Sequence, residues 1–135
     1  MKVLSLFDGI SCGMLALQRA GIPVECYDAF EIDKYAVTVS KRNFSVIVHH
    51  GNVYDGDFTQ FQGYDLLLGG SPCTYWSIAK KDREVDCNGE GFRLFKEYVR
   101  ALEESGCKYF LYENNYSVHQ NIKDEISRTP GVGTV

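Results

Sequence analysis

The fold is decided by the stretch Val3-Leu4-Ser5-Leu6-Phe7-Asp8-Gly9-Ile10-Ser11-Cys12-Gly13, in which an apolar run passes into a glycine turn. Residues 3–7 predict a first strand, and residues 14–20 have a helical pattern that ends at Gly21-Ile22-Pro23. Glycines at a strand-to-helix turn let the backbone approach a ligand closely, and the helix N-terminus favours a polar or anionic group. The spacing is not G-x-G-x-x-G, which argues against the usual dinucleotide fingerprint.

Strand-like and helical segments alternate along the rest of the chain. Further strands are expected at residues 25–30, 46–50, 64–68 and 108–112, and further helices at residues 33–42, 92–104 and 122–128. Alternation of this kind predicts an α/β fold with a parallel sheet and right-handed crossovers.

The composition is that of one ordinary soluble domain. The 135 residues, 44% of them hydrophobic and 24% charged, suffice for one core. No apolar run is long enough to span a membrane, and the first is too short for a signal peptide. The five cysteines are odd in number and form no C-x-x-C pair, so we expect free thiols in a cytoplasmic protein. Cys87, His49 and His50 fit no standard zinc spacing, and we expect no metal site.

Chemistry-bearing residues follow three of the predicted strands. Gly69-Gly70-Ser71-Pro72-Cys73-Thr74 follows the fourth strand, and Tyr112-Glu113-Asn114-Asn115 ends the fifth. In open α/β sheets, ligands collect beyond the carboxyl ends of the strands. Cys73 is therefore a candidate nucleophile, and we expect Glu113 to lie near it. The alternatives are a cysteine that acts only as a small hydrophobe and a strand end that is merely polar.

The second strand ends in Glu31-Ile32-Asp33. An acidic side chain at this point can accept hydrogen bonds from both ribose hydroxyls of a nucleoside. The alternative for Glu31 is a solvated helix cap, although Asp33 is the better cap because the helix follows it at once. The glycine turn and Glu31 together indicate an adenosine-containing ligand without selecting one.

Four motifs resemble those of DNA (cytosine-5) methyltransferases and occur in the same order. They are Leu6-Phe7-Asp8-Gly9-Ile10-Ser11-Cys12-Gly13, Glu31-Ile32-Asp33, Gly70-Ser71-Pro72-Cys73 and Glu113-Asn114. Trp76-Ser77-Ile78 and Gly91-Phe92-Arg93-Leu94-Phe95 look closest to phage and bacterial members and the related vertebrate de novo enzymes. The resemblance covers nearly the whole chain. It implies a Rossmann-like S-adenosylmethionine-dependent methyltransferase fold, mostly parallel with flanking helices, and position 5 of cytosine as the target.

The resemblance also implies the roles of particular residues. The cofactor site for S-adenosyl-L-methionine would consist of Phe7, Asp8, Gly9, Ile10, Gly13, Glu31, Ile32, Asn52, Val53, Gly70, Pro72 and Leu94. Phe7 and Ile32 would lie against the adenine, and Glu31 would hold the ribose. Asn52 stands where the family usually has Asp, and it can still accept a hydrogen bond from the adenine amino group without a full charge. The substrate site would consist of Ser71, Pro72, Glu113 and Asn114.

The expected chemistry uses Cys73 and Glu113 as catalytic residues. A Cys73 thiolate adds to C6 of cytosine, which turns C5 into a carbon that can take the methyl group. Glu113 would hydrogen-bond to the N3 and N4 edge of the base. The base must leave the duplex to reach such a pocket, and the polar loop at residues 80–91 is expected to close over it.

The chain also departs from the family pattern. It ends at residues 130–135, where the family would start another strand, so residues 1–135 are expected to form a partial catalytic domain without a target-recognition domain. DNA would then be held through separate segments, and the remainder of the enzyme or a second copy is the expected partner. A net charge of −4 does not favour binding to DNA phosphates, and Lys80, Lys81 and Arg83 form only a small basic cluster. A non-catalytic cofactor-binding or partner module is the alternative; a nucleotide-dependent oxidoreductase is disfavoured by the glycine spacing.

Overall fold

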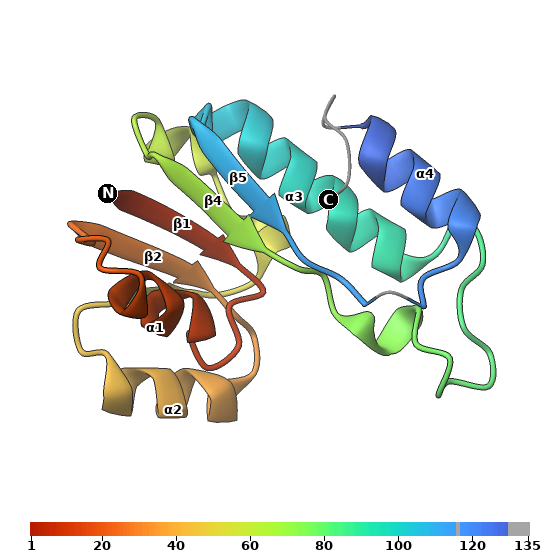
Figure 1. The fold of residues 1–135 in the computed structure, drawn as a ribbon, viewed down its shortest axis with the longest axis horizontal. Helices are drawn as coiled ribbons and strands as arrows, with labels where there is room; N and C mark the ends of the chain where they lie inside the picture. The colour runs from red at the N-terminus through yellow and green to blue at the C-terminus, as the bar shows by residue number, and fades with distance from the viewer. Residues whose placement is uncertain (116, 130–135) are drawn as a thin grey trace.

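A five-stranded parallel sheet in the order β3-β2-β1-β4-β5 organises the chain (Figure 1). The computed structural model describes residues 1–115 and 117–129. Its strands are β1 (Lys2–Leu6), β2 (Cys26–Phe30), β3 (Val48–His50), β4 (Leu66–Gly69) and β5 (Tyr109–Tyr112). After β3 the chain returns to the other side of β1 and forms β4, so the strand order reverses between β1 and β4. In open α/β sheets, the carboxyl ends of the strands at such a reversal form the ligand crevice.

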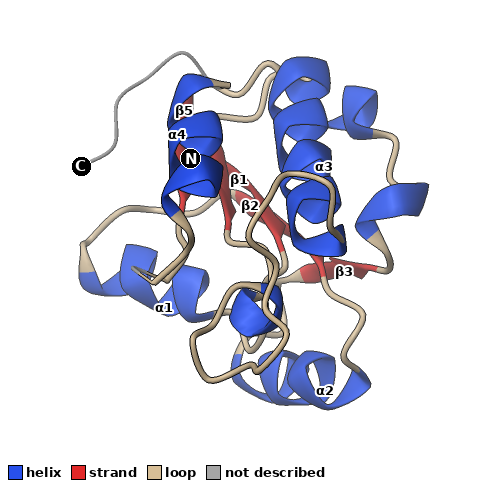
Figure 2. Ribbon diagram, turned by 90° about the vertical axis from the view of Figure 1, so that its right-hand side faces the viewer, coloured by secondary structure: helices blue, strands red, loops and turns tan. Residues whose placement is uncertain are grey.

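Outside the strands, the described residues form four helices and three short 3-10 turns. They are α1 (Cys12–Arg19), α2 (Lys34–Asn43), η1 (Val53–Asp55), η2 (Phe58–Phe61), η3 (Cys73–Tyr75), α3 (Glu90–Ser105) and α4 (Gln120–Arg128). Helices α1 and α3 lie on opposite faces of the sheet (Figure 2). No helix of the described residues is long and apolar enough to cross a membrane.

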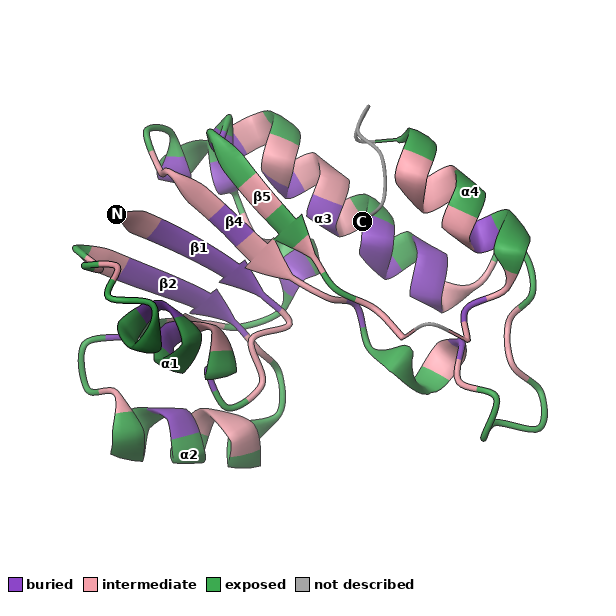
Figure 3. Ribbon diagram, viewed as in Figure 1, coloured by how far each residue is buried: buried purple, intermediate pink, exposed green. Residues whose placement is uncertain are grey.

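Both faces of the central strands are buried, which explains their continuous apolar sequence (Figure 3). Leu4 and Leu6 of β1 pack in the core under α3, whereas Val3 packs with Met14 and Leu17 of α1. A third apolar cluster joins Trp76, which follows η3, to α3 and α4. The segment that carries Cys73 is therefore packed against two helices.

The predicted α/β fold with a parallel sheet is confirmed, and the element boundaries differ by at most two residues. The first strand ends at Leu6 because Phe7 already has a positive φ of 56°. The strand expected at 46–50 begins at Val48, where pairing with Asp28 starts. The η turns have no periodic apolar pattern and were not expected. The chain end at 130–135 lies outside the described residues.

The strand at one edge of the sheet, β5, leaves part of one face uncovered. Tyr109 is 57% exposed and Leu111 is 61% exposed. An exposed apolar edge of this kind suits the expected partner, although the partner itself remains a prediction.

Candidate active site

A pocket of about 240 Å³ opens at the carboxyl ends of β1 and β2. Seven of the predicted cofactor residues line it: Phe7, Glu31, Ile32, Asn52, Val53, Pro72 and Leu94. Residues that were not predicted complete the wall, among them Tyr54, Tyr75 and Glu90. The site therefore gathers residues from five separate segments of the chain at the point where the strand order reverses.

The turn between β1 and α1 has an unusual backbone. Phe7, Gly9 and Ser11 all have positive φ, at 56°, 58° and 67°, which is uncommon for residues other than glycine. Asp8 holds this turn, because its carboxylate accepts hydrogen bonds from the hydroxyls of Ser5 and Tyr27, each at 2.6 Å, and from Ser11. The Asp8 carboxylate thus fixes the shape of the turn and does not line the pocket.

Glu31 joins the ends of the first two strands. Its Oε2 accepts a hydrogen bond from the Gly9 amide at 2.8 Å, and its Oε1 accepts one from the Asp33 amide at 2.9 Å. Asp33 caps α2, with Oδ1 accepting from the amides of Tyr35 and Ala36. Each Glu31 oxygen retains acceptor capacity, so the carboxylate can still receive hydroxyl groups of a ligand.

The remaining predicted cofactor residues do not form the wall of the pocket. A Cβ at Gly13 would lie 2.9 Å from both Leu68 and the Tyr27 hydroxyl, so Gly13 lets α1 approach the sheet. Ile10 is half exposed. Gly9 contributes its amide to Glu31, and Gly70 lies against Glu113.

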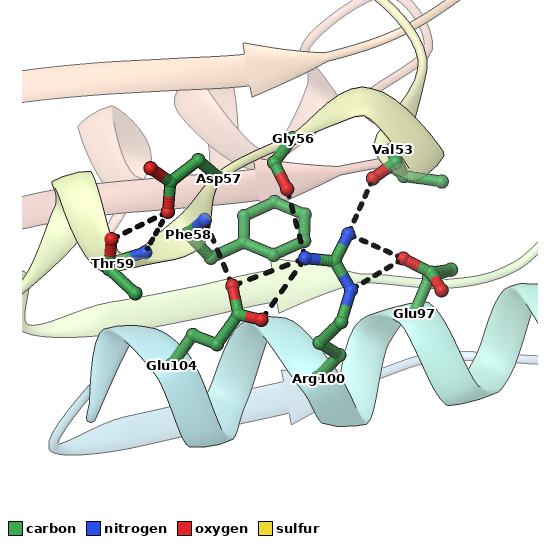
Figure 4. A network of polar contacts seen from close by, with 8 residues as sticks. All are labelled: Val53, Gly56, Asp57, Phe58, Thr59, Glu97, Arg100 and Glu104. Carbon is green, nitrogen blue, oxygen red and sulfur yellow. Dashed lines mark hydrogen bonds and ion pairs between the residues drawn. The ribbon is translucent and has the colours of Figure 1, made fainter.

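The wall formed by Asn52 and Val53 is fixed from behind by Arg100 of α3 (Figure 4). The Arg100 guanidinium donates to the carbonyl oxygens of Val53 and Gly56, each at 2.9 Å. It also pairs with Glu97 at 2.6 Å and with Glu104 at 3.1 Å. These polar groups are partly buried and bond to one another, and such a network holds a backbone segment firmly.

The loop that carries Cys73 touches the end of β5. A Cβ at Gly70 would lie 2.3 Å from the Glu113 carbonyl oxygen and 3.2 Å from Glu113 Oε2. The Glu113 amide donates to the Gly69 carbonyl at 2.9 Å. Gly70 lies three residues before Cys73 in this loop and has no side chain. Glu113 can therefore lie directly against the loop.

A polar cluster fastens the same two strand ends together. The hydroxyls of Ser71 and Tyr112 lie 2.5 Å apart, and Asn114 Nδ2 donates to the Ser71 carbonyl at 3.2 Å. Burial raises the pKa of Tyr112, so its phenol stays protonated and can donate. Ser71 and Asn114 thus bond to each other. Tyr112 was missed, although its place directly before Glu113 was a signal.

Cys73 is an exposed thiol at the first position of η3. Its backbone carbonyl accepts hydrogen bonds from the amides of Trp76 and Ser77, at 3.1 and 2.9 Å. Pro72 and Tyr75, on either side of it in the sequence, line the pocket. By contrast, Cys107 is buried, and burial raises the pKa of its thiol. Cys73 thus combines accessibility with a fixed backbone beside the pocket.

The loop at residues 80–91 is anchored at its centre. Glu84 Oε2 accepts from Trp76 Nε1 at 3.2 Å and from the Gly91 amide at 3.1 Å. This carboxylate satisfies the N-terminus of α3, where the capping residue Gly89 offers no side chain. Arg83 donates to the Ser117 carbonyl, while Lys80 and Lys81 are exposed. Closure of this loop over a substrate stays a prediction.

Within residues 1–115 and 117–129, no three His, Cys, Asp or Glu side chains group as metal ligands would. His50 bonds to Asp28 at 2.8 Å, and His49 Nε2 lies 3.2 Å from the Ser40 hydroxyl. Ser40 lies 2.5 Å from the Ser11 hydroxyl, which bonds to Asp8. A chain of hydrogen bonds therefore joins His49 to the turn that lines the pocket.

The lowered pKa of His49 predicts that the stability of the protein depends on pH. Burial, with a contribution from Lys41, lowers the pKa of His49 in the folded protein below its ordinary value of about 6.5. The unfolded chain then binds more protons below pH 6.5, so stability is lost as pH falls from there toward the folded pKa. We expect His49→Gln to weaken this loss, which cannot exceed about 1.4 kcal/mol per pH unit for one proton. Urea unfolding at pH 7.5 and 5.5 measures how much the free energy of unfolding falls between these two pH values.

The matched control for His49→Gln is His119→Gln. His119 lies at the start of α4 and is not part of the hydrogen-bond chain that reaches Asp8. An equal pH dependence in wild type and His49→Gln would contradict the prediction.

Comparison with known proteins finds similarity to one family over almost the whole chain. A family model of C-5 cytosine-specific DNA methylases matches residues 1–128. The orphan methyltransferase M.SPRI of Bacillus phage SPR is 38% identical over 118 residues, a match that covers 84% of this chain and 26% of that protein. DNA (cytosine-5)-methyltransferase DRM2 of Arabidopsis thaliana is 34% identical over 116 residues, covering 76% of this chain and 18% of its own length. The chain thus spans roughly a quarter or a fifth of these relatives.

Solved structures agree with this match. The S. pombe Dnmt2 methyltransferase superposes with a TM-score of 0.65 and 20% identity, over 96% of this chain and 39% of that one. A Spodoptera frugiperda DNMT2 mutant gives a TM-score of 0.59 with 23% identity, over 85% of this chain and 35% of that one. The parallel sheet with its flanking helices is the Rossmann-like fold of S-adenosylmethionine-dependent methyltransferases.

Proposed function

Because this chain belongs to the C-5 cytosine-specific DNA methylases, we propose that it is a catalytic subdomain that transfers a methyl group from S-adenosylmethionine to C5 of cytosine in DNA. One observation carries the proposal. The pocket that gathers Phe7, Glu31 and Leu94 is bounded by Pro72 and Tyr75, between which the exposed Cys73 lies, and the same loop touches Glu113.

The residues of the pocket fit the adenosine part of the cofactor. Phe7, Ile32, Val53 and Leu94 offer apolar surface to a flat base, and Glu31 offers acceptors to hydroxyl groups. The volume of about 240 Å³ lies below the roughly 300–1,000 Å³ of pockets that enclose a drug-sized ligand. We therefore assign the nucleoside to this pocket and the rest of the cofactor to the space beside it. Bound there, the cofactor supplies an electrophilic methyl group.

The chain's own residues would then activate the base. The Cys73 thiolate forms a bond from Sγ to C6 of cytosine, and the electron pair moves to C5. C5 takes the methyl group, a base accepts the C5 proton, and the bond from Sγ to C6 breaks. Glu113 would hold the N3 and N4 edge and offset the charge that develops at N3. Ser71 and Asn114 would keep the two strand ends in register during these steps.

DNA would approach from the side of Lys80 and Lys81, which are exposed on the loop that follows Cys73. A net charge of −4 supplies few phosphate contacts. We therefore propose that separate segments, from the rest of a longer enzyme or from a partner, hold most of the duplex. The target cytosine would be turned out of the helix toward Cys73.

A second candidate function is a non-catalytic module that binds the cofactor or acts as a partner subunit. The acidic net charge favours it. Methyl transfer to DNA by the chain alone would exclude this candidate. Cofactor binding without transfer, even when the DNA-holding segments are supplied, would support it.

Binding of S-adenosylhomocysteine tests the pocket. A ligand at 100 times its Kd stabilises the folded state by about 2.7 kcal/mol, so we expect the melting temperature to rise by several degrees. Glu31→Gln should weaken binding about 10-fold or more, because a charged acceptor for hydroxyl groups is lost. Glu25→Gln, at an exposed position before β2, is the control. A shift with NAD and none with S-adenosylhomocysteine would instead support an oxidoreductase.

A further inference from the structure

A second carboxylate lines the cofactor pocket. Glu90 is the first residue of α3, and its Oε1 accepts a hydrogen bond from the Tyr54 hydroxyl at 2.6 Å. Both side chains line the pocket, although 36 positions separate them in the sequence. Burial, with the bond to Glu90, raises the pKa of Tyr54 to about 12, so the phenol is a hydrogen-bond donor at neutral pH. Tyr54 therefore positions the Glu90 carboxylate.

The acceptor atom of Asn52 already has a partner. Asn52 Oδ1 accepts a hydrogen bond from the Tyr54 amide at 3.1 Å and so caps η1. A flipped amide would point Nδ2 at this N–H, donor against donor, so the network fixes the orientation. The Asn52 NH₂ group, a double donor, thus remains available to a ligand, and Oδ1 keeps one lone pair.

The polarity of these groups matters for an adenine ring. Adenine has one exocyclic amino group, which donates, and ring nitrogens, which accept. The Asn52 NH₂ group suits a ring nitrogen, whereas its neutral Oδ1, which already accepts from the Tyr54 amide, is a weaker acceptor for the amino group than a carboxylate. The carboxylate of Glu90 is acceptor-only when ionised, and one of its oxygens, Oε2, has only a 3.9 Å ion pair with Arg93. Glu90 is half-buried and reachable from the pocket.

We propose that Glu90 selects adenine in the cofactor by accepting a hydrogen bond from its exocyclic amino group, while Asn52 Nδ2 donates to a ring nitrogen. This inference rests on the proposed cofactor. It differs from the expectation that the Asn52 oxygen receives the amino group, which stays a prediction. Tyr54 acts as a positioning residue that holds the carboxylate from the other side.

The test compares two ligands that differ at the adenine amino group and at the neighbouring ring nitrogen N1, which carries a proton in the inosine compound. Calorimetric titration measures the Kd of S-adenosylhomocysteine and of S-inosylhomocysteine, whose base carries a carbonyl in place of the amino group. We expect wild type to prefer the adenosine compound about 10-fold or more, because the inosine carbonyl would face the Glu90 carboxylate. In Glu90→Gln the preference should fall to about 2-fold or reverse, since a glutamine amide can donate to the carbonyl.

Two further variants complete the test. Tyr54→Phe should lower the preference several-fold, because the carboxylate is no longer held. Glu103→Gln, at an exposed position of α3 outside the pocket, should keep the wild-type preference. The readout is a ratio of two Kd values on one protein, so partial unfolding of a variant does not alter it.

The outcomes separate this inference from the proposed function. An unchanged preference in Glu90→Gln, with tight binding of S-adenosylhomocysteine, would overturn the role of Glu90 and leave the cofactor assignment standing. Failure of wild type to bind either compound would overturn both.

Discussion

Replacing Cys73 with serine is expected to abolish covalent capture of DNA that contains 5-fluorocytosine. Fluorine at C5 cannot leave as a proton does, so a protein that adds a thiolate to C6 and methylates C5 stays bound to the base. A serine hydroxyl is a far weaker nucleophile than a thiolate at neutral pH. We expect the capture rate to fall on the order of 10³-fold or more. Incubation with S-adenosylmethionine and a denaturing gel measure the adduct.

The control for Cys73→Ser is Cys26→Ser. Cys26 is also a free cysteine, but it begins β2 and so lies at the opposite end of the strands from the pocket. Its variant should form the adduct at the wild-type rate. An adduct that persists in Cys73→Ser would refute the nucleophile. An adduct absent from wild type, even when the DNA-holding segments are supplied, would favour the non-catalytic module.

Local sequence patterns were sufficient for the elements of the fold. The signals that predicted these elements depend only on residues close together in the sequence. They are apolar runs of strand length, an amphipathic pattern over α3 and a glycine after the last turn of α3. Gly106 indeed ends α3 with a positive φ of 61°. Parallel strands open their carboxyl ends on one edge, so alternation alone also predicted that the loops after the fourth and fifth strands would meet.

The contacts that hold the site together could not be predicted in this way. Arg100 behind Val53 and Ser40 against Ser11 join positions 47 and 29 residues apart. Glu84 reaches the N-terminus of α3 from an irregular loop seven residues before Gly91. No periodic pattern marks such pairs, because each depends on where the completed fold places a single polar atom. The orientation of the Asn52 amide is of the same kind, since the Tyr54 amide sets it.

The site residues implied by the family resemblance divide by what their side chains do in the structure. Those that line the pocket are mostly apolar, while Asp8, Ser71 and Asn114 bond to other parts of the chain. The second group would act by keeping the turn and the strand ends in shape. Substitutions in it should therefore change stability and activity together, whereas changes at Glu31 or Cys73 should act mainly on binding or chemistry.

Gly70→Ala is the sharpest test of this coupling between shape and chemistry. The new Cβ would lie 2.3 Å from the Glu113 carbonyl oxygen, far inside contact distance. The β5 end can retreat only by breaking the bond from the Glu113 amide to the Gly69 carbonyl. We expect a loss of roughly 1–3 kcal/mol in the free energy of unfolding, measured in urea.

Covalent capture by Gly70→Ala should fall further than this loss of stability explains. At a temperature where the variant is fully folded, the displaced Glu113 no longer lies against the loop of Cys73, so we expect capture at least about 10-fold slower. Gly51→Ala is the stability control, because a Cβ there meets nothing within 4 Å and the glycine does not have a positive φ. It should unfold within about 0.5 kcal/mol of wild type. If Gly70→Ala matched wild type in both stability and capture, Glu113 would not depend on this contact, and its place in the mechanism would lose its structural basis.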